Sequence, residues 1–325
     1  MSPIPVGLIG VGRHGSRYLH HLLTDDTGGT LLAFSRNNEV EGQRLAHTHH
    51  LQFHPDWRDL LGNPSIQAVI VATPPALNLP IALEAIQAGK AVLMEKPLAL
   101  TPPQAQHIVD SANHAKVPFM TAQTLRYEPA IQTLQALGPS LGDWQYLSCT
   151  MRVETRSELS GKREGWGHYG VLMEFGIHLL DLVRFLTRDE VVSISTNLKS
   201  LSYEDPECRV WGSLITKRGL SCSIDVSRVS QGRVTRAEII GAQGQACADW
   251  TKHHVTLTQE GNKDTNYPCS KDPTLVPVLR DFFHALQTGT PMPITGEDGL
   301  QAVRIADACY QSAKFGHPVL LTQSN

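Results

Sequence analysis

The feature that most restricts the fold of this chain is a glycine-rich turn at residues 10–15, which directly follows an apolar, β-branched segment at residues 4–9. Tyrosine and leucine side chains recur at helical spacing over residues 18–23, so the turn joins a predicted strand to a predicted helix. In this setting the first glycine permits a tight turn, the second lets the backbone approach a pyrophosphate, and the third lets the helix pack closely on the strand. The N–H groups and dipole of the helix N-terminus favour the negative charge of a pyrophosphate. The turn therefore predicts a dinucleotide site formed by Gly10, Gly12, Arg13, His14 and Gly15.

Strand and helix patterns alternate through the first part of the chain. The segment at residues 67–73 is apolar on both faces, as a parallel sheet covered by helices requires. Further strands are predicted at residues 30–35, 90–95 and 117–121, and helices at 79–86 and 101–115. This alternation predicts a doubly wound parallel α/β domain of the Rossmann type over residues 1–123.

The pattern changes after residue 123. A long strand at 144–154 and a helix at 172–187 precede short strands at 191–199, 208–216, 220–228, 234–240 and 253–259, with final helices at 274–288 and 298–314. This order predicts an α+β domain over residues 124–325, with a mainly antiparallel sheet and helices on one face. We expect the other face to be apolar and covered by a second copy, giving a homodimer or homotetramer through residues 191–259.

Composition excludes several classes of partner. A net charge of −3 provides no basic surface for nucleic acid, and no apolar run approaches the ~20 residues of a membrane span. The N-terminus lacks a signal-peptide pattern, which predicts a cytoplasmic protein. The six cysteines lack the close spacing of disulfide frameworks or zinc sites. No metal is expected, because the histidines clustered at 47–54 have no carboxylate or cysteine at ligand spacing.

The end of the second predicted strand bears on the choice of dinucleotide. An acid about 20 residues after the glycine turn would bind the ribose 2′-hydroxyl of NAD, but the chain has Ser35 and Arg36 there. A guanidinium can bind a 2′-phosphate, so NADP is the favoured cofactor. NAD is the alternative, because Glu39 lies close enough in sequence to serve as the acid.

At this point the chain resembles the glucose-fructose oxidoreductase/inositol dehydrogenase/rhizopine-catabolism (Gfo/Idh/MocA) family over nearly its whole length. The similar segments are residues 73–75, 88–97, 125–129, 174–181, 296–302 and 316–320. The resemblance implies a dinucleotide domain followed by a domain with a large open sheet that forms dimers or tetramers. It also implies oxidation or reduction of a secondary alcohol carbon on a sugar, sugar nucleotide or cyclitol.

The resemblance and the loop composition together suggest further site residues. For the cofactor they are Ser35, Arg36, Thr73, Pro74, Pro75, Asn78, Glu95, Lys96 and Gln123. For the substrate they are Lys96, Arg126, Tyr127, Glu174 and His178, with Trp166 and Tyr169 from the polar loop at 155–170.

Lys96, His178 and Glu174 are the candidate catalytic residues. Lys96 follows a parallel strand, so it emerges at the sheet edge where α/β domains bind ligands, and it can stabilise a developing alkoxide. Glu174, His178 and Asp181 share one helix face, and Gly176 is expected to leave room for a ligand. We assign His178 as general acid/base, with Lys96 meeting it on one substrate hydroxyl in the cleft between the domains. Glu174 stands where the family usually has aspartate, which leaves open whether it orients His178 or touches the substrate.

Two other functions are compatible with this sequence. A glycosidase of the same fold would use NAD transiently, without net change in the cofactor. A sensor would bind the dinucleotide and a partner protein without catalysis, but it would need neither Lys96 nor His178.

Overall fold

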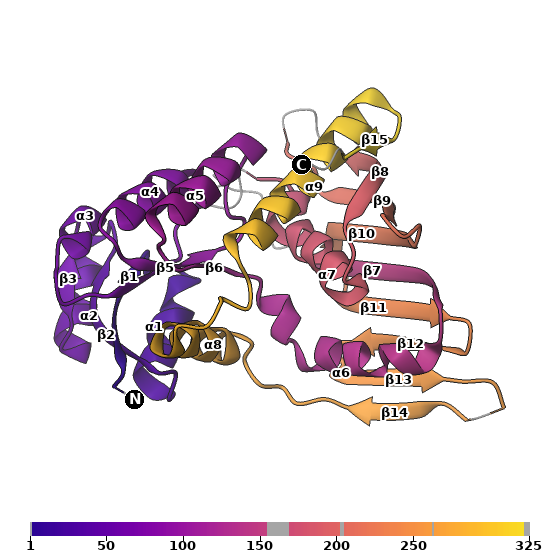
Figure 1. Ribbon diagram of the computed structural model, residues 1–325, viewed down its shortest axis with the longest axis horizontal. Coiled ribbons are helices and arrows are strands. Elements are labelled where there is room, and N and C mark those ends of the chain that lie inside the picture. Colours follow the sequence, from indigo (N-terminus) through magenta and orange to yellow (C-terminus); the bar gives the residue numbers. More distant parts are fainter. Residues whose placement is uncertain (1, 155–168, 202–204, 262, 322–325) are drawn as a thin grey trace. The chain divides into compact units, whose positions relative to one another are not determined.

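The computed structural model describes residues 2–154, 169–201, 205–261 and 263–321. The chain forms two compact units, one of residues 1–124 and 273–303 and the other of residues 125–272 and 304–325 (Figure 1). Most of the polar loop predicted to bind substrate, residues 155–168 with Trp166, lies outside the described part of the chain.

The first unit contains a parallel sheet with strand order β3-β2-β1-β4-β5-β6, the order of a Rossmann fold. Its central strands are apolar and almost completely buried, because helices cover both faces. The strands are β1 (Ile4–Ile9), β2 (Gly29–Ser35), β3 (Gln52–His54), β4 (Ala68–Val71), β5 (Ala91–Glu95) and β6 (Phe119–Ala122). The helices are α1 (Gly15–Thr24), α2 (Glu39–His49), α3 (Trp57–Leu61), η1 (Pro75–Leu77), α4 (Asn78–Gln87) and α5 (Pro102–Ala115). The predicted doubly wound α/β fold is confirmed.

Helix α8 (Leu275–Thr288) belongs to the first unit although it comes late in the chain. Its Phe283 ring fills the space beside Gly29, where an added Cβ would lie 2.3 Å from the ring. Arg280 also donates to the carbonyl of Asp26 at 2.9 Å. A boundary at residue 123 places residues 273–303 with the second unit, whereas these contacts tie them to the first.

The second unit contains a nine-stranded sheet of order β14-β13-β12-β11-β7-β10-β9-β8-β15. Its neighbouring strands are antiparallel except for the parallel pair β7 and β10, which confirms a mainly antiparallel sheet. The strands are β7 (Trp144–Glu154), β8 (Val191–Lys199), β9 (Arg209–Thr216), β10 (Ser221–Ser230), β11 (Val234–Gly241), β12 (Gly244–Asp249), β13 (His254–Thr258), β14 (Thr265–Pro268) and β15 (Val319–Leu320).

The helical elements of this unit pack on one face of the sheet. They are η2 (Thr124–Tyr127), α6 (Pro129–Leu137), η3 (Gly138–Leu141), the π-helical turn η6 (Leu172–Gly176), α7 (Ile177–Thr187) and the second half of α9 (Gly296–Phe315). Alternate strand residues, such as Leu147, Ile224 and Leu214, are buried beneath them. One residue of α9, Cys309, accepts a hydrogen bond from Thr196 on this same face at 2.7 Å.

The opposite face of the sheet is polar, so the prediction of an apolar face was wrong. Strand register places Ser195, Ser213, Ser223 and Ser148 in one row across four strands of that face. The neighbouring row contains Trp211, which is 36% exposed. The strands alternate largely between apolar and polar positions, so most of their apolar side chains pack against the helices.

Within the described residues no helix is long and apolar enough to cross a membrane.

Candidate active site

Two of the three glycines in the turn between β1 and α1 have a steric reason to be glycine. Gly10 has φ +93°, and an added Cβ would lie 2.8 Å from the carbonyl oxygen of Ala72. At Gly15 an added Cβ would lie 1.9 Å from the carbonyl oxygen of Gly10. Gly12 is different, since an added Cβ there would meet nothing within 4 Å. The turn is therefore closed on the protein side and open at Gly12, as a backbone cradle for a pyrophosphate must be.

The end of β2 is joined to this turn. The backbone N–H groups of Gly10 and Val11 donate to the carbonyl of Ser35 at 3.0 and 3.3 Å, and Ser35 itself is buried. Arg36 is half-buried, with its Nη1 at 3.9 Å from Oε1 of Glu41. Arg44 holds the same carboxylate with two hydrogen bonds of 2.6 and 2.8 Å. The acid expected from the sequence to serve NAD was Glu39, but Glu41 is the carboxylate that approaches Arg36.

A buried carboxylate connects the glycine turn to the end of β5. Glu95 is 4% exposed and accepts hydrogen bonds from Nε2 of His14 at 2.7 Å and from the Tyr18 hydroxyl at 2.6 Å. Its second oxygen accepts from the backbone N–H of Lys96 at 3.1 Å. Burial raises the pKa of Glu95, but the charges of His14 and Lys96 and the hydrogen bonds together lower that pKa to about 2. Glu95 is thus an anion that fixes the main chain at Lys96, which is itself half-buried.

Two buried amides lie farther along the same sheet edge. Asn78 is 1% exposed, accepts from the Thr73 hydroxyl at 3.2 Å and donates to the carbonyl of Pro97 at 2.8 Å. It therefore ties the start of α4 to the segment after Lys96. Gln123 is also 1% exposed, and neither polar atom of its amide has a hydrogen-bond partner among the described residues. Of the other expected cofactor residues, Arg13 and Pro74 are exposed and Pro75 is buried.

These features fit a nicotinamide dinucleotide. The open cradle at Gly12 leaves space for a pyrophosphate, and an unsatisfied buried amide at Gln123 needs a polar partner such as a carboxamide. The half-buried Lys96 stands between them in the chain, at the carboxyl end of a parallel strand.

The segment predicted as one helix at 172–187 begins with a π-helical turn. The turn η6 covers Leu172–Gly176 and α7 continues from Ile177. Such turns are rare and occur frequently at functional sites. Glu174 lies in the turn and its Oε2 accepts from Nη1 of Arg228 at 3.1 Å. His178 lies in the first turn of α7 and is half-buried, with its Nδ1 atom buried.

Gly176 does not provide the room for a ligand that the sequence suggested. An added Cβ there would lie 2.7 Å from the Leu172 side chain and 3.5 Å from that of Val226. The glycine instead lets the helical turn pack closely on β10. That expectation was wrong, because the space above Gly176 is filled by neighbouring apolar side chains.

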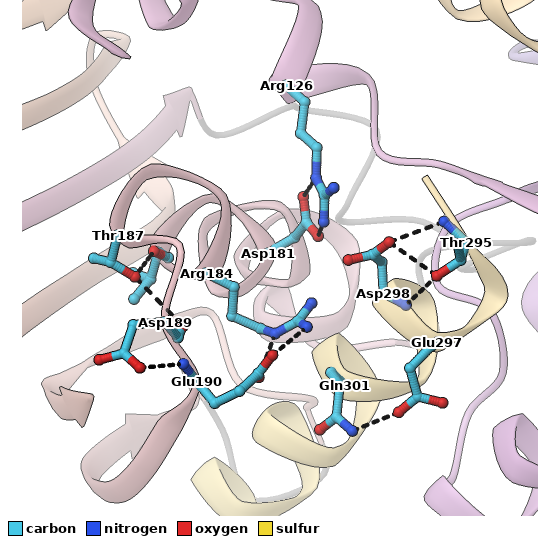
Figure 2. A network of polar contacts seen from close by, with 11 residues as sticks. Arg126, Asp181, Arg184, Thr187, Asp189, Glu190, Thr295, Glu297, Asp298 and Gln301 are labelled. Atoms are coloured by element: carbon cyan, nitrogen blue, oxygen red, sulfur yellow. Dashed lines mark hydrogen bonds and ion pairs between the residues drawn. The ribbon is translucent and has the colours of Figure 1, made fainter. Parts of the chain in front are cut away.

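Arg126 is held in a two-pronged ion pair with Asp181. Its Nε and Nη2 donate to the two carboxylate oxygens at 2.8 and 2.6 Å, and Asp181 is 1% exposed (Figure 2). The pair joins η2 to α7, so the Nε–Nη2 edge of the Arg126 guanidinium is used within the protein. Nearby in the chain, Tyr127 is half-buried, and burial raises the pKa of Glu128 to about 7. Tyr169 is half-buried and its carbonyl accepts from Arg228 at 3.0 Å.

Three residues of these networks escaped sequence analysis. Tyr18 lies one helical turn after His14, and Glu128 lies inside the segment 125–129 that resembles the family. The sequence near each residue could therefore have indicated a place in the site. Arg228 lies 54 residues from its partner Glu174 and had none. Lys96 belongs to the first unit and His178 to the second, as expected.

Comparison with known proteins identifies the family. The profile described as oxidoreductase family, NAD-binding Rossmann fold, matches residues 4–123. A second profile, described as oxidoreductase family, C-terminal alpha/beta domain, matches residues 162–321. The chain belongs to the Gfo/Idh/MocA family.

Similar members of the family span the whole chain. The scyllo-inositol 2-dehydrogenase (NADP(+)) IolW of Bacillus subtilis is 24% identical over 99% of this chain and 97% of its own. The scyllo-inositol 2-dehydrogenase (NAD(+)) of the same organism is 23% identical over 97% and 95%. Among solved structures, levoglucosan dehydrogenase in complex with NADH and levoglucosan has a TM-score of 0.88 at 20% identity, over 99% of this chain and 100% of that one.

Proposed function

We propose that this family member transfers a hydride between a nicotinamide dinucleotide and a secondary alcohol carbon of a sugar, sugar nucleotide or cyclitol. The relatives named above act on cyclitols by their names, and the similar solved structure holds an anhydrosugar with NADH. The observation that carries the proposal is the anchoring of Lys96. Glu95 fixes the main chain at Lys96, and His14 of the glycine-rich turn holds Glu95.

The proposed roles follow from proton chemistry. The bound dinucleotide supplies the hydride acceptor or donor. Lys96 donates a hydrogen bond to the reacting oxygen and stabilises negative charge as the hydroxyl proton leaves. His178 accepts that proton in oxidation and returns it in reduction. Arg126 is assigned to positioning α7 through Asp181, since its guanidinium already binds that carboxylate.

NADP is the proposed preferred cofactor. Arg36 supports this choice, because it follows a strand end that has no acid to repel a 2′-phosphate. The nearby Glu41 is held by Arg44, so its charge is largely balanced before a phosphate arrives. Relatives of both cofactor types exist, and NAD is the alternative.

A dimer or tetramer through the polar face of the nine-stranded sheet is also proposed. Interfaces are not distinguished by bulk hydrophobicity, and they are enriched in tryptophan and arginine. Trp211 lies on this face with the Arg209 guanidinium 5.0 Å from the centre of its ring.

The experiment for the proposed function is a spectrophotometric screen of sugars, sugar nucleotides and cyclitols with NAD and NADP. We expect net reduction of the nicotinamide with at least one free or nucleotide-linked polyol. Turnover of a glycoside without net change in nicotinamide absorbance would instead identify a glycosidase. Dinucleotide binding without turnover of any compound would support a sensor.

A further inference from the structure

Arg228, on strand β10, is a charged residue buried next to the proposed catalytic helix. Its side chain is 6% exposed. Its Nη1 donates to the carbonyl of Tyr169 at 3.0 Å and to Oε2 of Glu174 at 3.1 Å. One guanidinium nitrogen therefore joins the segment before the π-helical turn to the carboxylate inside it.

The backbone of the same turn is held by a different group. Glu207 accepts from the backbone N–H of Leu172 at 3.1 Å and from the Tyr310 hydroxyl at 2.9 Å. At Gly170 an added Cβ would lie 1.7 Å from the Glu207 carboxylate, so a larger residue would displace that carboxylate. Burial, with the neighbouring Glu207 charge, raises the pKa of Tyr310, which keeps its hydroxyl as a donor. Glu207 thus fixes the main chain at Leu172, whereas Arg228 holds the Tyr169 carbonyl and the Glu174 side chain.

The length of the residue at position 174 matches this arrangement. An aspartate at the same backbone position would place its carboxylate ~1.5 Å farther back, beyond hydrogen-bond reach of Arg228. A buried guanidinium that loses its carboxylate keeps the cost of desolvation without the compensating attraction. The glutamate that departs from the family pattern is therefore the residue that Arg228 requires.

Pairing also changes what Glu174 offers to a ligand. A carboxylate balanced by a guanidinium keeps oxygen lone pairs that accept hydrogen bonds, but it has little net attraction left for a cation. About a fifth of the Glu174 side chain is exposed, so a ligand can reach this side chain.

We propose that Arg228 is a positioning residue that fixes and neutralises Glu174, so that the site selects a substrate with a neutral hydroxyl at this position over one with an ammonium group. This inference rests on the proposed function, since it concerns the substrate of that same site.

The test compares four variants with the wild type: Arg228→Met, Arg228→Lys, Glu174→Gln and the double variant Arg228→Met with Glu174→Gln. The probes are a cyclitol or sugar found in the screen and its counterpart with one hydroxyl replaced by a free amine. We expect the wild type to favour the neutral compound in kcat/KM by about tenfold or more. Arg228→Met should reduce that preference by about tenfold, mainly through a lower KM for the amine compound, because the guanidinium no longer balances the Glu174 carboxylate. Arg228→Lys keeps the charge and should largely keep the preference.

Thermal unfolding of the apoprotein gives a second readout that needs no substrate. Arg228→Met should lower Tm by about 5 °C, because it removes the guanidinium that pairs with a partly buried carboxylate. Adding Glu174→Gln removes that carboxylate and should restore part of the loss. In the double variant, kcat/KM for the amine compound should not rise above that of the wild type.

Two results would overturn the inference. One is an equal fall of Tm in Arg228→Met and in the double variant, which would make Arg228 a packing residue. The other is an unchanged preference between the two compounds in Arg228→Met. If the wild type turns over no polyol, the proposed function fails and the substrate part of this inference fails with it. Recovery of Tm in the double variant would still support the positioning of Glu174 by Arg228.

Discussion

Replacing Gly15 by alanine puts a methyl group where the structure has no space for one. The added Cβ would lie 1.9 Å from the carbonyl oxygen of Gly10, whereas ordinary van der Waals contact begins at 3.4 Å. The obstacle is backbone, so it cannot rotate away as a side chain would. Helix α1 and the turn must separate by about 1.5 Å to accept the methyl group.

The size of the effect follows from this displacement. Overpacking of this kind costs about 1–3 kcal/mol, and for a unit of this size each kcal/mol lowers Tm by about 2–4 °C. We therefore expect Gly15→Ala to melt roughly 2–12 °C below the wild type. Because the same shift moves the N–H groups at the start of α1, dinucleotide affinity should fall by about tenfold or more.

Gly12→Ala is the matched control. Its added Cβ meets nothing within 4 Å, so Tm should be unchanged or slightly higher, as for a glycine replaced without strain. Dinucleotide affinity should nevertheless fall, because the methyl group occupies the approach of the pyrophosphate. Differential scanning calorimetry and fluorescence titration with the dinucleotide measure the two quantities. A Gly15→Ala variant that melts with the wild type would refute the packing argument, and undiminished binding by Gly12→Ala would refute the cradle.

Three further outcomes are expected. Arg36→Ala should bind NADP about tenfold less tightly in a direct titration and leave NAD affinity unchanged, and equal NADP affinity in both proteins would contradict the cofactor assignment. Because the pKa of Glu95 is lowered from its usual 4.5 to about 2, its stabilising effect is present above pH 4.5 and disappears as the pH falls towards 2. The unfolding free energy of Glu95→Gln should therefore fall below that of the wild type above pH 4.5 and converge with it at lower pH, and a constant difference would exclude this linkage. Sedimentation at micromolar concentration should show a dimer or tetramer that Trp211→Glu dissociates, whereas a wild-type monomer of 35.7 kDa would disprove the assembly.

The parts of the structure that were predictable from the sequence are those set by neighbouring residues. The pattern of residues 4–9 coincides with β1, and that of residues 144–154 coincides with β7. Period-two and helical patterns predict strands and helices from residues close in sequence. Glycines with a strict steric role can be recognised by their fixed spacing. The short strands β3 and β14 escaped because three or four residues carry too little periodicity.

The rest depended on contacts between distant residues. Asp181 seemed to belong to a charged helix face, yet it is buried against Arg126, 55 residues earlier in the chain. Glu174 was a candidate to orient His178, yet it pairs with Arg228, which lies on a strand of the sheet beneath. A helix pattern shows which residues share a face, but it does not show which strand residue will face them. The polar outer face of the large sheet was also not predicted. The pattern of each strand does not show that the helices would cover its apolar residues and leave polar residues on the other face.

The most direct test of the account is the pH dependence of kcat in Lys96→Met, His178→Ala and a control, Glu128→Gln. Loss of acid/base assistance should lower kcat by about 10²-fold or more in the first two variants, with dinucleotide affinity nearly unchanged. The limb of the pH–rate profile near neutrality should disappear in His178→Ala. It should persist in Glu128→Gln, although the pKa of Glu128 is also raised to about 7. A His178→Ala variant with full kcat and weaker substrate binding would make the histidine a binding group and contradict the mechanism.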